Sequence, residues 1–172
     1  MPSFTPMHNR PLAWLSGALL AIALTLAAPS SALAEQGGFS LEDMIAVTPS
    51  EKPFGATVDA LRREVAAAGW TMVNENNMAG VLSARGFTLH PVMIFDVCSG
   101  QHSVPILRQD ALRPLTAFMP CRVSVYQTSD EQVFIARMNV AALAPMLPPD
   151  AAEVMQQAAR EIDEIVTRAV SR

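Results

Sequence analysis

Lysine and cysteine are scarce in this sequence. Lys52 is the only lysine among 172 residues, and the chain has two cysteines. Schiff-base catalysis needs a lysine whose pKa is lowered by its surroundings, and the phosphate-binding P-loop needs a lysine after a glycine-rich loop. A single lysine between Glu51 and Pro53 matches neither pattern. Arg62-Arg63 is the only pair of adjacent basic residues, and acidic residues outnumber basic ones. The composition therefore argues against lysine-based catalysis and against a nucleic-acid partner, which would need a basic patch.

Catalytic groupings of side chains are also missing. The sequence shows no nucleophile-base pair and no glycine-rich phosphate loop. Of the carboxylates, Glu42-Asp43 lies near the start of the mature chain, and Glu161, Asp163 and Glu164 fall on the polar face of a predicted helix. Hydrolase and nucleotide-binding functions thus have little support, and we expect a binding protein rather than an enzyme.

The N-terminus has the pattern of a secretory signal. Arg10 is the only charged residue among residues 1–34, and the segment 11–28 that follows it is almost wholly apolar. Ala32-Leu33-Ala34 supplies the small side chains that a signal peptidase accepts, so we predict a signal peptide over 1–34 that is cleaved between Ala34 and Glu35. The alternative is an uncleaved anchor, because roughly 17 apolar residues are the minimum for a membrane span.

Cleavage at this point defines the mature protein. It leaves 11 basic and 16 acidic residues, a formal charge of −5. We expect this form to be periplasmic or secreted, with no membrane contact after the signal is removed. Residues 35–42 are polar and glycine-rich and are predicted to be a flexible leader, and residues 43–172 are predicted to form a single domain.

Hydrophobic periodicity within 43–172 predicts an α+β domain. Short runs of β-branched and aromatic residues that end at turn residues predict five strands, at 44–48, 70–74, 92–98, 121–126 and 133–138. Apolar residues at helical spacing predict long helices over 58–68 and from about residue 150 to the C-terminus, with shorter helical segments in 79–86 and 102–112. The expected fold is a single antiparallel sheet of about five strands with two long helices packed on one face, in β-α-β4-α order.

Capping residues set the expected helix ends. Thr57 is the predicted N-cap of the first long helix, and Gly69 the residue that ends it. Asp150 and Glu153 predict a capping box at the start of the last helix. That helix has an apolar face that must pack across the sheet, formed by Val154, Ala158, Ile162, Ile165 and Ala169.

Several motifs resemble the domain of unknown function 302 family across about residues 43–170. They are Thr57-Val58-Asp59-Ala60-Leu61, Ala68-Gly69-Trp70, the strand that ends at Cys98, and above all Met119-Pro120-Cys121-Arg122-Val123-Ser124-Val125-Tyr126. The resemblance implies a TATA-binding-protein-like β-α-β4-α fold and no established reaction. Members often have an Asn-Pro pair after the first cysteine, where this chain has Ser99-Gly100.

Cys98 and Cys121 are the only cysteines. One leaves a predicted strand and the other enters the next, so the two side chains are expected side by side. In an oxidising compartment they are disulfide candidates, and the bond would close a loop of about 24 residues, which stabilises the fold by roughly 3 kcal/mol through the lost entropy of the unfolded chain.

The same residues suit ligand binding. Cys98, His102 and Cys121 combine thiols with an imidazole, which suits copper, zinc or an axial position on haem. A haem would be held without covalent attachment, because the Cys-x-x-Cys-His motif is absent. Any metal site is expected at His102 and Cys98. His90 is interpreted as a residue at the entry to a strand.

Three hypotheses therefore stay open. The first is an exported binding or accessory domain, dimeric, with a cleft bordered by the Cys98–His102 loop and Cys121. The second is a thiol-redox protein that uses the two cysteines, although it lacks the catalytic Cys-x-x-Cys pattern. The third is a structural module that meets a periplasmic protein partner through the sheet face carrying Arg122, Ser124 and Tyr126.

Overall fold

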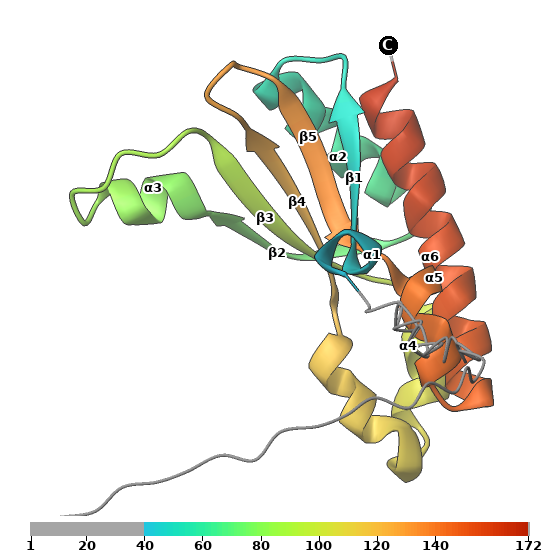
Figure 1. Cartoon of the computed structure of the whole chain (residues 1–172). Helices are drawn as coiled ribbons and strands as arrows, with labels where there is room; N and C mark the ends of the chain where they lie inside the picture. The colour runs from blue at the N-terminus through green and yellow to red at the C-terminus, as the bar shows by residue number, and fades with distance from the viewer. Residues whose placement is uncertain (1–39, 172) are drawn as a thin grey trace, which may run out of the picture. The chain divides into compact units, whose positions relative to one another are not determined.

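Five antiparallel strands lie in the spatial order β1-β5-β4-β3-β2 in the computed structural model, which describes residues 40–171 (Figure 1). The strands are β1 (Ile45–Ser50), β2 (Thr71–Asn77), β3 (Val92–Cys98), β4 (Cys121–Gln127) and β5 (Val133–Met138). The helices are α1 (Leu41–Met44), α2 (Phe54–Ala67), α3 (Met78–Ser83), α4 (Gly100–Leu107), α5 (Val140–Leu143) and α6 (Pro149–Val170), with 3-10 helices η1 (Asp110–Phe118) and η2 (Ala144–Met146). The predicted fold class is confirmed.

The two long helices, α2 and α6, cover one face of the sheet. Alternate strand residues point to that face, as the two-residue period of a strand requires. Phe95, Val125 and Ile135 are fully buried there against Leu61 of α2 and Ile165 of α6. We call this cluster the main core.

A second, smaller group of buried residues lies beyond the end of the sheet, where α6 continues past it. We call it the accessory cluster, and it consists of Ile106, Leu112, Val140, Ala151 and Met155. These residues come from α4, η1, α5 and the first half of α6. Because α6 has 22 residues, it is about 33 Å long and contributes to both clusters.

The other face of the sheet carries exposed apolar residues. In the register of β1 and β5, Ile45 lies opposite Met138 and Val47 opposite Ala136. Val47 is 49% exposed. Tyr126 of β4 stacks on Phe134 of β5 with a centroid distance of 5.4 Å. An apolar patch is therefore present on the face for which a protein partner was expected.

The two outermost strands are irregular. Pro49 lies within β1, which continues to Ser50 although it was predicted to stop before the proline. A proline is tolerated here because β1 is an edge strand and one side of its backbone pairs with no other strand. On the opposite edge, the register of β2 shifts between Met72 and Asn74, which marks a bulge.

The start of α2 corrects one prediction. Thr57 is not the N-cap but lies one turn inside the helix, where it is fully buried. Its hydroxyl donates to the carbonyl oxygens of Lys52 and Pro53, each at 3.1 Å, and lies 2.7 Å from Oγ of Ser50. The helix starts earlier than predicted, at Phe54, with Pro53 at the N-cap position. At the other end, Gly69 has a φ of +74°, as its role of ending the helix requires.

The start of α6 corrects a second prediction. The Asp150 and Glu153 capping box does not form: the N-cap is Pro148, without a side-chain hydrogen bond. Pro149 occupies the first helical position, where the fixed φ of proline suits a helix and its missing N–H costs nothing. Of the predicted apolar face, Val154 is only partly buried, and Ala158, Ile162, Ile165 and Ala169 are buried.

Two smaller predictions also differ from the structure. β2 continues beyond the predicted strand 70–74 to Asn77, whose side chain then accepts a hydrogen bond from the first turn of α3. The single helix expected over 102–112 is divided into α4 and η1 because Gln109 between them has an extended backbone.

The predicted signal peptide and the leader up to residue 39 lie outside the described residues. Within residues 40–171, no helix is both long and apolar enough to cross a membrane.

Candidate functional site

Cys98 and Cys121 lie at the same end of two paired strands. Val97 of β3 pairs with Cys121 of β4, so Cys98 is one residue beyond that pair. Both side chains are free thiols in the structure and both line one cavity of about 20 Å³. The disulfide between them stays a prediction. We call this space the thiol cavity.

The thiol cavity is too small for a porphyrin. A volume of about 20 Å³ corresponds to roughly one water molecule or one ion. Its walls come from β3, α4, α6, the start of β4 and the residue before β2. They include Trp70, Ser103, Met119 and Ala158 besides the two cysteines. The non-covalent haem that was considered from the sequence therefore does not fit this space, whereas a single metal ion does.

The two cysteines differ in their surroundings. Sγ of Cys98 lies 3.1 Å from the hydroxyl oxygen of Ser103 in the first turns of α4. Burial, and to a smaller extent the nearby Cys98, raise the pKa of the Cys121 thiol from its ordinary value of 9.0 to about 11. Cys121 is thus protonated at neutral pH. An attacking thiol in a redox enzyme needs the opposite shift, so this environment does not favour redox catalysis by Cys121.

His102 is buried and faces a carboxylate on the last helix. Its Nε2 lies 3.0 Å from Oε1 of Glu161, although it makes no well-directed hydrogen bond. Nε1 of Trp70 donates to Oε2 of the same carboxylate at 2.8 Å, and the Trp70 and His102 rings lie 5.8 Å apart. Glu161 therefore joins α6 to the strand end at Trp70 and to α4.

This arrangement shifts the pKa of Glu161. Burial raises it, but the hydrogen bond from Trp70 and the contact with His102 together outweigh burial, so the pKa lies below the ordinary value of 4.5. Sequence reasoning placed Glu161 on a solvated helix face and gave Trp70 no role. Trp70 itself was a signal in the sequence that some acceptor would be found nearby, because a buried indole N–H needs a hydrogen-bond acceptor.

The candidate ligands do not form a complete three-ligand site. Within residues 40–171, no group of three or more His, Cys, Asp or Glu side chains is arranged to hold a metal ion. His102 lines the thiol cavity, but its Nε2 is at Glu161. His90 is exposed in the segment before β3 and is not among the residues that line the cavity. Of the ligands predicted from the sequence, the two thiols are left at this cavity, which the thioethers of Met119 and Met155 also line.

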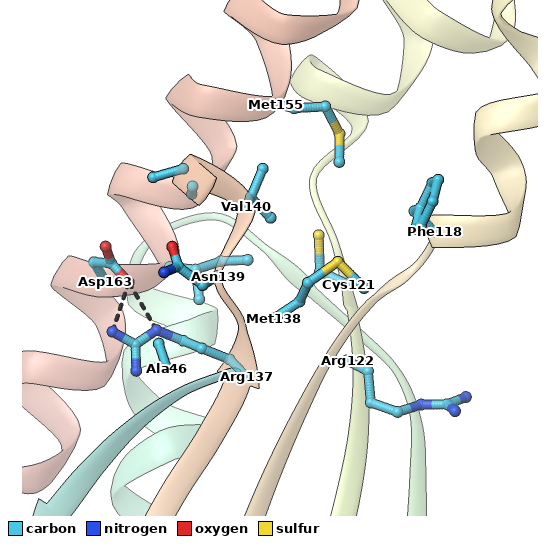
Figure 2. A pocket seen from close by; sticks show the side chains of 13 residues that line it. Ala46, Phe118, Cys121, Arg122, Arg137, Met138, Asn139, Val140, Met155 and Asp163 are labelled. Atoms are coloured by element: carbon cyan, nitrogen blue, oxygen red, sulfur yellow. Dashed lines mark hydrogen bonds and ion pairs between the residues drawn. The ribbon is translucent and has the colours of Figure 1, made fainter. Parts of the chain in front are cut away.

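A larger apolar space adjoins the thiol cavity. Phe118, Met138, Val140 and Met155 line two neighbouring hollows of about 110 and 230 Å³, which we together call the apolar pocket. Cys121 lines the smaller hollow as well as the thiol cavity. Figure 2 shows Met155 and Phe118 on the helical side of this space and Met138, Cys121 and Arg122 at the strand ends.

Comparison with known proteins identifies a family and a fold. Residues 46–169 match the family model described as domain of unknown function DUF302. Among solved structures, the chain is similar to the crystal structure of an uncharacterized conserved protein DUF302 from Bacillus stearothermophilus, with a TM-score of 0.66, 19% identity, and coverage of 73% of this chain and 98% of that chain. That likeness shows the fold alone. No curated protein matches the chain.

Proposed function

The chain belongs to the DUF302 family, whose function is unknown, and we propose that it is an exported, non-enzymatic binding protein that captures a thiophilic metal ion, Cu(I), between Cys98 and Cys121. The observation that carries this proposal is the position of both free thiols on one cavity with the volume of a single ion. Within the described residues, Cys98 contacts the Ser103 hydroxyl and His102 contacts Glu161, and neither thiol is hydrogen-bonded to the imidazole, which supports binding rather than catalysis.

The number and type of ligands favour Cu(I). Soft thiolates select Cu(I) and zinc among the common metals. Structural zinc sites almost always have four protein ligands, and two thiols do not supply them. Cu(I) is stable with two sulfur ligands, so it is the ion that the Cys98 and Cys121 pair suits best. Nε2 of His102 is at Glu161, so the proposed site does not require His102 as a ligand.

Binding of the ion must displace the proton of Cys121. A thiol coordinates as the thiolate, and the pKa of Cys121 is raised to about 11. The apparent affinity for Cu(I) should therefore increase with pH throughout the range from 6 to 9. One proton from Cys121 is released for each ion bound.

The test uses the reduced protein from Glu35 onward under anaerobic conditions, in competition with a chromogenic Cu(I) chelator such as bicinchoninate. We expect one Cu(I) per chain, and a loss of affinity of at least 100-fold in Cys98→Ser and in Cys121→Ser. Ser103→Ala is the matched control: it removes the hydroxyl beside Cys98, keeps both sulfurs, and should change affinity less than fivefold. A lack of stoichiometric binding, or a larger loss in His102→Ala than in Cys98→Ser, contradicts the proposal.

The same two sulfur atoms also support the alternative of a disulfide. Thiol titration of the exported protein with and without reductant distinguishes a bridge from two available ligands. A reduction potential below about −300 mV would indicate a structural bridge rather than a catalytic one. Export itself is tested by the mass of the mature protein, which should begin at Glu35.

A second candidate function is a protein-interaction module. The exposed apolar patch of Ile45, Val47 and Met138 on the open sheet face favours it. Its expected partner is a periplasmic protein or a second copy of the chain. Sedimentation of Val47→Glu beside the unchanged protein tests the homodimer, which should dissociate in the variant if this face is the interface.

A further inference from the structure

We propose that the apolar pocket binds one small, uncharged and largely apolar molecule, a ligand distinct from the ion proposed at the thiol pair. The pocket lies where the strands end and α6 continues past the sheet. Its walls come from separate segments of the chain, with Phe118 from η1, Met138 from β5, Val140 from α5 and Met155 from α6 (Figure 2).

The larger hollow of the pocket is lined by apolar residues, whereas polar and charged residues also border the smaller hollow. Val140, Leu143 and Met155 are buried at the base. At the rim, Phe118 is exposed and Met146 is 69% exposed. Methionine side chains adapt to differently shaped ligands, which suits a site that accepts a class of apolar molecules. An occupant would cover apolar surface that is otherwise in contact with water, which favours its binding.

The volume of the pocket limits the size of the occupant. Hollows of about 110 and 230 Å³ together lie near the lower end of the range for small-molecule sites, about 300–1,000 Å³. This space suits a short aliphatic chain or one or two fused rings. It is too small for a helix of a partner protein, which would need an extended groove.

The charged residues at the strand end of the pocket are already paired. Arg137 donates through Nε to Oδ1 of Asp163 at 2.7 Å and through a terminal nitrogen to Thr48 at 2.9 Å. Nε of Arg122 lies 3.1 Å from Oδ1 of Asp96. A charged group on the ligand would have to compete with these pairs and lose its own hydration. An uncharged ligand has neither cost.

The pocket shares one wall with the thiol cavity, because Cys121 lines both. An occupant should therefore shield the Cys121 thiol from reagents that approach through the pocket. This shielding gives a second readout that does not depend on the fluorescence of a probe.

The test uses two probes with the same rings and different charge. They are N-phenyl-1-naphthylamine, which is uncharged, and 1-anilinonaphthalene-8-sulfonate, which carries a sulfonate. The protein from Glu35 onward contains the five strands and the two buried clusters described above, and it is titrated with each probe. We expect saturable binding of one uncharged probe per chain, at least tenfold tighter than the sulfonate. Tighter binding of the sulfonate overturns the inference of an uncharged ligand.

Variants locate the bound probe. Met146→Glu places a charge at the rim and should weaken binding at least tenfold. Phe87→Glu is the matched control, because Phe87 is 60% exposed and does not line the pocket, and it should leave binding unchanged. Val47→Glu tests the open sheet face. Loss of binding in Val47→Glu with retention in Met146→Glu places the probe on the sheet and overturns the proposal.

Two further measurements close the test. In Cys98→Ser, whose remaining thiol is Cys121, the uncharged probe should slow reaction with a thiol reagent at least threefold, and no slowing contradicts the proposal.

The full chain is titrated beside the form that begins at Glu35. Equal binding supports a free small-molecule ligand. Binding by the shorter form alone would make the preceding segment the occupant and would overturn the proposal.

Discussion

The main core and the accessory cluster differ in how completely they are filled. In the main core, Phe95, Leu61 and Ile135 have no exposed surface, and residues from four strands meet two long helices. In the accessory cluster, Met155 borders the thiol cavity and both hollows of the apolar pocket. The filled cluster holds the sheet and the long helices together, whereas the loosely filled cluster borders the spaces for which ligands are proposed above.

Truncation of one large side chain in each cluster should give the largest difference. Phe95→Ala removes a fully buried ring from the main core and should lower the free energy of unfolding by about 3–5 kcal/mol. Met155→Ala should cost only about 2 kcal/mol, near the lower limit for such a change, because cavities already surround its side chain. Urea unfolding monitored by circular dichroism measures both. Equal losses would contradict the division between the clusters.

The free energy of unfolding should fall in alkali, because Cys121, which lies between the two clusters, ionises there. Because the pKa of Cys121 is raised from 9.0 to about 11 on folding, the folded state holds this proton more tightly than the unfolded state. The resulting stability is complete below pH 9 and is lost as pH rises through 11, and a shift of this size corresponds to at most about 2–3 kcal/mol.

Unfolding of the reduced protein in urea between pH 8 and 11 measures this loss. Cys121→Ser is the control, since serine does not ionise in this range and its pH profile should be flatter. An unchanged profile in the serine variant would show that another group causes the alkaline loss.

A polar group inside the main core should have a smaller effect. Thr57→Val keeps the shape of a fully buried side chain but removes the hydroxyl that bonds Lys52 and Pro53. The expected loss is about 1 kcal/mol, because the carbonyl acceptors at the helix start lose one donor. Thermal or urea unfolding measures it. A stabilised Thr57→Val would show that these hydrogen bonds do not offset the burial of the hydroxyl.

The smallest expected effect is at Glu161. Its pKa is lowered on folding, so its contribution to stability is complete above the ordinary value of 4.5 and is lost as pH falls through the lowered pKa. Since the side chain is 42% exposed, the contribution should stay below about 1 kcal/mol. Unfolding between pH 3 and 6 should show a weaker acid dependence in Glu161→Gln. In Trp70→Phe, nuclear magnetic resonance titration should show a higher pKa for Glu161.

Sequence patterns predicted the main core better than the accessory cluster. The predicted strand 92–98 coincides with β3 because a short, continuous apolar run between turn residues has few other conformations. The Gly69 turn was predictable because a positive φ favours glycine. The start of α2 was not, since the Thr57 hydroxyl satisfies the same local pattern in an N-cap and in a buried turn of the helix.

The candidate site depended on contacts between distant segments. The neighbouring positions of Cys98 and Cys121 followed from the predicted strands, because one strand ends and the next begins at a cysteine in an antiparallel arrangement. The contact of Trp70 with Glu161 joins residues 91 positions apart, and no local pattern marks it. The apolar pocket was equally hidden, because Phe118, Met138 and Met155 are simply apolar residues until the fold places them around one space.

The irregular outer strands affect how the protein associates with itself. An edge strand with free backbone groups is a template for adding another strand, which is the usual route to fibrous aggregates. Pro49 lacks an N–H on one border of the sheet, and the shift between Met72 and Asn74 distorts the other. Growth of the sheet from chain to chain is thus disfavoured at both borders. A pair of chains that met through the open sheet face would therefore not extend further by strand addition at these borders.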